Sequence, residues 1–159
     1  VNENIIDVLI YIYETYMDGE NQLPPDQVMI EEHLLKVGFQ EREISKAFDW
    51  LDELAWRQGS LQESGDISQA AMRIYSDEEI QRIDLESRGL LLHLEQHGVL
   101  DPISRELVIE RAMALETPEL DSDDIQWIAL LVLLNQPGQE AAFTVMQNLV
   151  YDGTPELLH

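Results

Sequence analysis

The chain has 159 residues, 45% of them hydrophobic, with nine Lys and Arg against 32 Asp and Glu and a formal net charge of −23. This length predicts one domain with a sizeable buried core, and the apolar content excludes an acidic disordered tail. The absence of cysteine excludes disulfides, a thiolate nucleophile and Cys-ligated zinc, so we expect a reducing, cytoplasmic location.

Helical periodicity dominates the first part of the chain. Apolar side chains recur three and four residues apart over residues 4–18, which predicts a helix that is buried on several sides. Two consecutive prolines precede a second helix, which Gly38 is expected to close as a C-cap. A third helix is expected over residues 41–57, so that residues 1–57 form an N-terminal helical lobe.

Residues 58–75 are predicted to form a loop or hinge, because Ser, Gln and Gly accumulate there without helical periodicity. Residues 73–75 are the one place where the pattern suggests a short extended segment. The rest of the chain, residues 76–159, is predicted to form a C-terminal helical lobe. The expected fold is therefore an all-α, compact bundle of about seven helices in two lobes that together make one unit.

Side chains that can accept hydrogen bonds from the first helical turn mark three helix starts in the C-terminal lobe. They are Ser76, which forms a capping box with Glu79, then Asp101, and then Asp121 or Ser122. The first of these helices is expected to run to Gly98, the third is apolar on nearly every side, and a last helix ends near residue 150.

The negative charge is spread over both ends of the chain. Residues 1–35 and 112–159 contain no Lys or Arg and eight acids each. Direct binding to nucleic-acid phosphates or to an anionic membrane is therefore disfavoured. A helix-turn-helix around Gly38 would present residues 41–54, whose net charge of −3 disfavours DNA. Two interpretations stay open: a solvated acidic surface, or an acidic face that binds a basic partner or mimics a nucleic acid.

His93 and His97 lie one helical turn apart, a spacing that can hold a metal ion. The metalloprotease pattern needs Glu directly after the first histidine, where Leu94 stands, and the sequence offers no obvious third ligand. We therefore expect ordinary helix positions, with no metal and no cofactor. No nucleophile, base and orienting group assemble in the sequence either, so we expect that the protein is not an enzyme.

Arg73 and Tyr75 are the candidate partner-binding residues. They flank the stretch without helical periodicity, and Arg and Tyr are favoured anchors in recognition loops. The alternative is structural: Arg73 ties the loop to a carboxylate, and Tyr75 packs near Ile80 as the residue before the capped helix.

Several segments together resemble one family. They include IIDVLIYIYETY, GFQEREISKAFDWL, SRGLLLHLEQHGVLD and DDIQWIALLVLLNQPG. In this order, over essentially the whole chain, they are similar to the Smg family of proteobacteria, a family of unknown function. The resemblance implies no established activity, cofactor or catalytic residue, so it gives no site residues.

The sequence therefore favours an acidic helical protein that binds another protein, with a basic protein as one candidate, as a non-enzymatic adaptor or regulator. The alternative is a nucleic-acid-associated factor that acts through a basic partner or as an acidic nucleic-acid mimic. Neither direct nucleic-acid binding nor membrane binding is expected.

Overall fold

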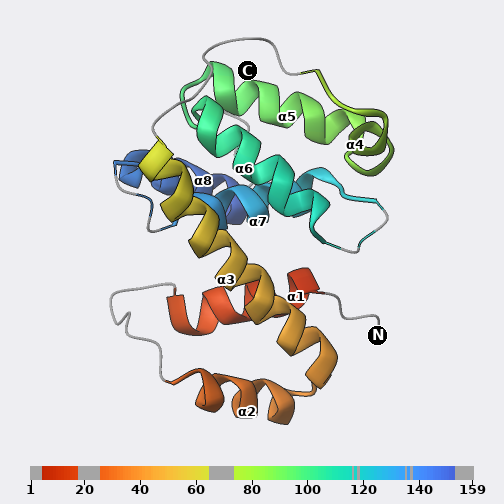
Figure 1. Ribbon diagram of the computed structural model, residues 1–159, viewed down its shortest axis with the longest axis vertical. Helices are drawn as coiled ribbons and strands as arrows, with labels where there is room; N and C mark the ends of the chain where they lie inside the picture. Colours follow the sequence, from red (N-terminus) through yellow and green to blue (C-terminus); the bar gives the residue numbers. More distant parts are fainter. Residues whose placement is uncertain are drawn as a thin grey trace. The chain divides into compact units, whose positions relative to one another are not determined.

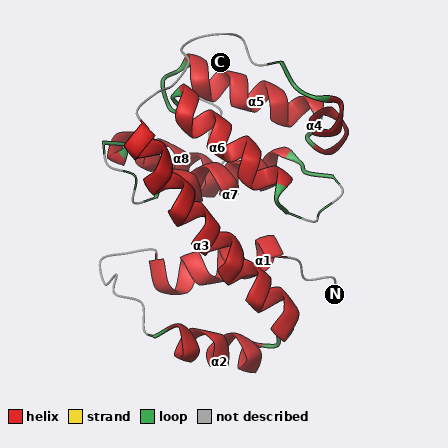
Figure 2. Ribbon diagram, in the orientation of Figure 1, coloured by secondary structure: helices red, strands yellow, loops and turns green. Residues whose placement is uncertain are grey.

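A computed structural model of the chain describes residues 5–17, 26–64, 74–115, 117, 119–134, 136 and 138–152. These residues form helices and connecting loops, and none of them forms a β-strand (Figure 2). The predicted all-α fold is confirmed. The chain divides into two compact units, Val1–Glu53 and Leu54–His159. None of the helices in the described ranges is long and apolar enough to cross a membrane.

The first unit contains three helices and a π-helical turn (Figure 1). They are α1 (Ile5–Ile12), the π-helical turn η1 (Tyr13–Met17), α2 (Gln27–Val37) and residues 41–53 of α3 (Glu41–Ser64). Five of the eight residues of α1 are buried, which confirms the helix that the apolar periodicity predicts at the start of the chain.

Both ends of α2 are capped. The Asp26 carboxylate accepts a hydrogen bond from the Val28 amide at 3.2 Å. Gly38 has a φ of +120°, a conformation that side chains other than glycine's rarely adopt, and its amide donates to the carbonyls of Leu34 and Leu35. The predicted glycine C-cap is confirmed, and the chain reaches α3 after the three residues 38–40.

Helix α3 continues to Ser64, so the prediction that a loop begins at residue 58 is wrong for residues 58–64. Within this stretch, the side chain of Gln58 makes a tertiary contact, which explains its polar character. The Gln58 side-chain amide donates to the Val132 carbonyl at 2.8 Å, and Gly59 is exposed with open space around it. Residues 65–73 of the predicted hinge lie outside the described residues.

The second unit contains the rest of α3 and five further helices (Figure 1). They are α4 (Asp77–Arg82), α5 (Leu85–Gln96), α6 (Pro102–Met113), α7 (Ser122–Leu133) and α8 (Glu140–Asp152). Helix α7 packs against α5, α6 and α8, and seven of its twelve residues are buried and apolar. This confirms the prediction of a deeply buried helix and makes α7 the centre of this unit's core.

The predicted helix starts in the second unit are confirmed. The Ser76 hydroxyl accepts from the Glu79 amide at 3.2 Å, and the Glu79 carboxylate accepts from the Ser76 amide at 2.9 Å. Asp101 caps α6 through the Ser104 amide at 2.7 Å. Asp121, rather than Ser122, is the N-cap of α7.

The single helix expected from residue 76 to Gly98 is wrong, because α4 and α5 are separate helices. Ile83 has extended backbone and forms an isolated parallel bridge with Leu120. Asp84 then caps α5 by accepting from the Ser87 amide at 2.8 Å. A buried apolar residue at helical spacing does not reveal that a helix stops there. Ile74 and Tyr75, in the segment where a short extended piece was suggested, belong to no helix, strand or bridge, and Arg73 lies outside the described residues.

Candidate functional site

Arg82, the last residue of α4, is used as a structural hydrogen-bond donor. Its guanidinium donates to the carbonyls of Met113 at 2.9 Å, of Thr117 at 2.9 and 3.2 Å, and of Leu115. These carbonyls belong to the last residue of α6 and to the segment after it, where a helix leaves its last acceptors without partners in the helix. These acceptors lie more than 30 residues further along the chain than Arg82.

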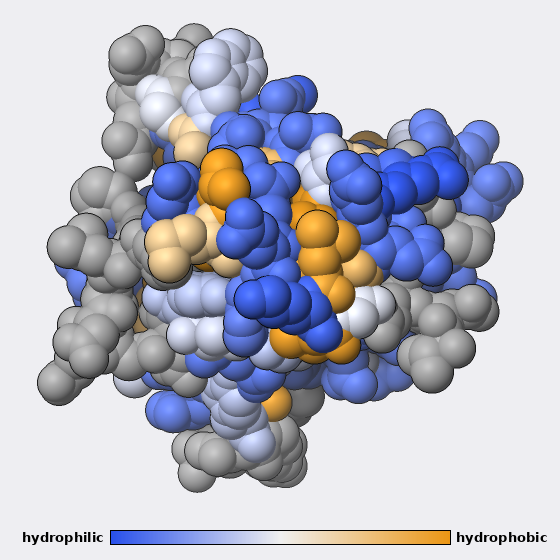
Figure 3. All heavy atoms as spheres, turned by 90° about the horizontal axis from the view of Figure 1, so that it is seen from below, coloured by the Kyte–Doolittle hydropathy of each residue, from blue (hydrophilic) through white to orange (hydrophobic). Residues whose placement is uncertain are grey.

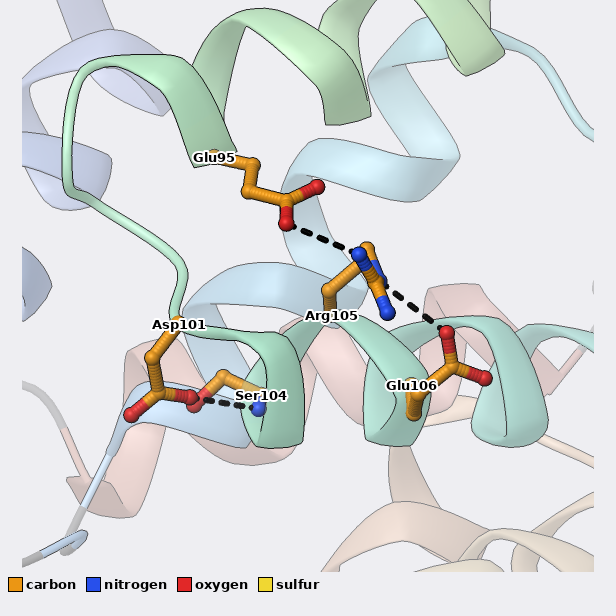
Figure 4. Close-up of polar contacts among 5 residues, drawn as sticks. All are labelled: Glu95, Asp101, Ser104, Arg105 and Glu106. Carbon is orange, nitrogen blue, oxygen red and sulfur yellow. Dashed lines mark hydrogen bonds and ion pairs between the residues drawn. The ribbon is translucent and has the colours of Figure 1, made fainter. Parts of the chain in front are cut away.

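Arg105 is a buried arginine, with a side chain 9% exposed, at the start of α6 (Figure 4). Its Nη1 lies 2.8 Å from Glu95 Oε2 and its Nε lies 3.0 Å from Glu106 Oε2. Figure 4 shows that Glu95 comes from the end of α5, so this pair ties two helices together beside the Asp101 cap. Removing one member of such a pair would leave a desolvated charge.

Arg111 is also buried and pairs with its neighbour in the chain. Its Nε and Nη2 lie 2.6 and 2.8 Å from the two Glu110 carboxylate oxygens, in a fork that matches both. Arg57 from α3 approaches the same carboxylate at 3.2 Å, and Arg88 Nε donates to the Ile83 carbonyl at 3.1 Å. Every arginine described in the second unit therefore contacts the protein itself.

The residues predicted to bind a partner are only partly described. Arg73 lies outside the described residues, and Tyr75 is half-buried directly before the Ser76 cap. Ile80, against which Tyr75 is expected to pack in the structural alternative, is 43% exposed. Both interpretations of Arg73 and Tyr75 stay predictions.

His93 and His97 stack on α5, with ring centroids 5.9 Å apart. His97 Nδ1 lies 2.8 Å from the His93 carbonyl oxygen, so the Nδ1–H donates and the Nε2 is the remaining acceptor. His93 Nδ1 is buried without a hydrogen-bond partner among the described atoms. Over the described part of the chain, no group of three His, Cys, Asp or Glu side chains is placed to hold a metal ion.

Asp121 and Asp124 form a reciprocal capping box at the start of α7. The Asp124 amide donates to the Asp121 carboxylate at 2.9 Å, and the Asp121 amide donates to the Asp124 carboxylate at 3.2 Å. Burial, together with the neighbouring carboxylates of Asp121 and Asp123, raises the pKa of Asp124 to about 6. This carboxyl titrates near neutral pH, yet its hydrogen bonds serve the helix end.

Helix α2 exposes apolar side chains that the sequence pattern places on a packed helix. Val28, Met29, Leu35 and Val37 are 55%, 59%, 48% and 47% exposed. Their neighbours Ile30 and Leu34 are buried, so the inner side of α2 is already occupied. Figure 3 shows orange apolar side chains at the surface between blue hydrophilic ones. Periodicity alone missed this face, because it does not distinguish a buried apolar residue from an exposed one.

Comparison with known proteins agrees with the resemblance seen in the sequence. Residues 5–159 match the family described as "Protein of unknown function (DUF494)". The chain is similar to the protein named "Protein Smg homolog" from three bacteria. It is 44% identical to the one from Thioalkalivibrio sulfidiphilus and 45% identical to the one from Nitrosococcus oceani, in both cases over the full length of both chains.

It is also 47% identical to the protein of that name from Vibrio cholerae, over 98% of this chain and 99% of the relative. No solved structure matches the chain. The match to the family covers nearly all of the chain, and the relatives match it from end to end. The chain therefore belongs to the Smg (DUF494) family, whose function is not established.

Proposed function

We propose that this protein is a non-enzymatic adaptor or regulator that binds a basic segment of another protein through its acidic surface. One observation carries this proposal: the arginines described in the second unit are bonded to groups of the protein itself. Five of the nine Lys and Arg, namely Arg57, Arg82, Arg88, Arg105 and Arg111, contact carboxylates or carbonyls of the chain itself. The net charge of −23 therefore lies mostly on carboxylates that no cation of the protein balances.

Such a surface attracts cations over a distance. A protein field of one sign steers an oppositely charged partner and raises its association rate at low ionic strength. The same field repels nucleic-acid phosphates, because neutralising them requires exposed Lys or Arg. The described cations outside the second unit are Lys36, Arg42 and Lys46, which lie among the acids of α2 and α3.

The polar groups described here also support a non-enzymatic role. Carboxylates and hydroxyls at five helix starts accept backbone hydrogen bonds. They belong to Asp26, Ser76, Asp84, Asp101 and Asp121. The buried Ser104 hydroxyl contacts the Gln136 amide oxygen at 3.5 Å, which is not a base. These groups stabilise helices, and an adaptor does not require them to take part in catalysis.

Affinity capture from a lysate of the native host, followed by mass spectrometry, tests the proposal. We expect one basic protein to be enriched at low salt and to be lost at high salt. Mixing the purified protein with duplex DNA or RNA at physiological salt should give no mobility shift. Micromolar nucleic-acid binding with a steep salt dependence would contradict the proposal.

A further inference from the structure

We propose that the outer side of α2 is the docking surface of this protein and that it takes a basic amphipathic helix of a partner protein. This outer face is defined by Val28, Met29, Glu32, Leu35 and Lys36. The inference rests on the proposed function and names where on the surface, and by which chemistry, the partner binds.

The outer face combines apolar exposure with a spacing that suits a second helix. Val28 and Leu35 are seven residues apart, two helical turns, so they lie in one line along α2. Glu32 lies between them on the same side and is exposed, and Met29 extends the apolar surface by one position. Val28 and Leu35 are therefore spaced by one heptad, the spacing at which apolar residues of one helix pack against a second helix.

The backbone under this face is fixed before any partner arrives. Asp26 and Gly38 cap the two ends of α2. His33 on the same helix accepts or donates a hydrogen bond at 3.0 Å with the Tyr11 hydroxyl, and its ring contacts Tyr16 at a centroid distance of 6.2 Å. A helix held in this way loses little conformational freedom on binding. A larger part of the free energy gained by burying the exposed apolar side chains therefore appears as binding affinity.

The charge of the residues around the outer face of α2 distinguishes between the molecules that could bind there. Helix α2 carries Glu31, Glu32 and one cation, Lys36, and it follows the Asp26 cap. The first turn of α3 adds Glu41, Arg42 and Glu43, so that the Asp26 cap, α2 and this turn together carry five acids and two cations. A partner helix whose apolar stripe is flanked by Lys or Arg would bury Val28 and Leu35 while placing a cation opposite Glu32. A second copy of this chain would place another net charge of −23 next to the first, so the two copies would repel each other. An anionic membrane would be repelled in the same way.

The test uses a synthetic peptide of leucine and lysine, about 18 residues and five helical turns long, with an amphipathic helical pattern. A scrambled peptide of the same composition keeps the charge and loses the apolar stripe. Binding of each peptide to the full chain is measured by fluorescence anisotropy. We expect the amphipathic peptide to bind at least tenfold more tightly than the scrambled one.

Three variants locate the binding. Val28→Ser combined with Leu35→Ser should weaken amphipathic-peptide binding about tenfold or more, because it removes the apolar line. Glu31→Gln combined with Glu32→Gln should reduce the salt dependence of binding. Leu85→Ser, at a residue that is 75% exposed on α5, is the matched control and should bind as the unmodified protein does. Circular dichroism checks that each variant is folded.

Equal binding of both peptides, or binding of neither, would overturn the proposed docking surface. So would equal affinity of the Val28→Ser/Leu35→Ser variant and the unmodified protein. Sedimentation that shows a dimer, lost in that variant, would assign the face to a second copy and also overturn the proposal. In each of these cases, capture of a basic partner from a lysate would still stand as the separate test of the proposed function.

Discussion

Replacing Arg82 with alanine removes one guanidinium that binds the carbonyls of Met113, Leu115 and Thr117. Hydrogen bonds from a charged donor contribute about 1.5–3 kcal/mol each, and the four bonds that this one group makes to three carbonyls are not additive. Leu115 is buried, so its carbonyl is poorly placed to find water instead. We therefore expect a loss of about 3–4 kcal/mol in the free energy of unfolding of the second unit.

For a unit of roughly 100 residues, this loss corresponds to a fall of about 10 °C or more in Tm. Thermal melts followed by circular dichroism, with urea titrations, measure it. Arg82→Lys keeps the charge but not the planar fork of donors, so it should recover less than half of the loss. Arg42→Ala removes the same charge from an exposed position on α3 and should change the stability by less than about 0.5 kcal/mol.

A Tm of Arg82→Ala within about 2 °C of the unmodified protein would refute this reasoning. It would mean that the loop after α6 is held by other contacts. This result would also contradict the claim that Arg82 stabilises the fold and is therefore not available to bind a ligand.

Three further predictions follow from the helix ends and the histidine pair. The pKa of Asp124 in the folded protein, about 6, exceeds the ordinary 3.8, so the folded state favours the protonated carboxyl. Its contribution to the free energy of unfolding is complete below about pH 4 and is lost as the pH rises through 6. Asp124→Asn should therefore raise Tm relative to the unmodified protein at pH 7.5 more than at pH 4, and a difference that does not change with pH would contradict this. Tyr75→Ala should lower Tm, because Tyr75 is half-buried before a capped helix; an unchanged Tm with loss of a captured partner would favour recognition instead. Elemental analysis should find no stoichiometric metal, and chelator should leave Tm unchanged, whereas a tightly held zinc would contradict the expectation that His93 and His97 are ordinary helix residues.

Local signals in the sequence predicted four capped helix ends correctly. Ser76, Asp101 and Asp121 cap the helices that their positions indicate, and Gly38 has the positive φ that a glycine stop requires. Each of these features depends on a few consecutive residues. Such capped helix ends can therefore be predicted without knowledge of the tertiary structure.

The features that depend on distant residues were missed. The break at Ile83 exists because its backbone pairs with Leu120, and the extension of α3 includes Gln58, which donates to Val132. The hydrogen-bond acceptors of Arg82 could not be predicted either, because they lie more than 30 residues further along the chain.

The candidate site was less predictable than the fold. Charge composition indicated an acidic surface, but only the structure shows that the arginines it describes in the second unit contact the protein itself. The pattern of α2 indicated a packed helix, and Leu35 fits that pattern as well as the buried Leu34 does. Which apolar residues remain exposed is decided by what packs against them, and that information is not local.

The central claim is that uncompensated carboxylates bind a basic partner, and the salt dependence of that binding tests it most directly. Isothermal titration of the purified protein with the captured partner, repeated over a series of salt concentrations, gives the measurement. We predict an affinity that falls steadily as salt rises and a smaller slope for the Glu31→Gln/Glu32→Gln variant. An affinity that does not change with salt, or a captured partner that is itself acidic, would contradict the account.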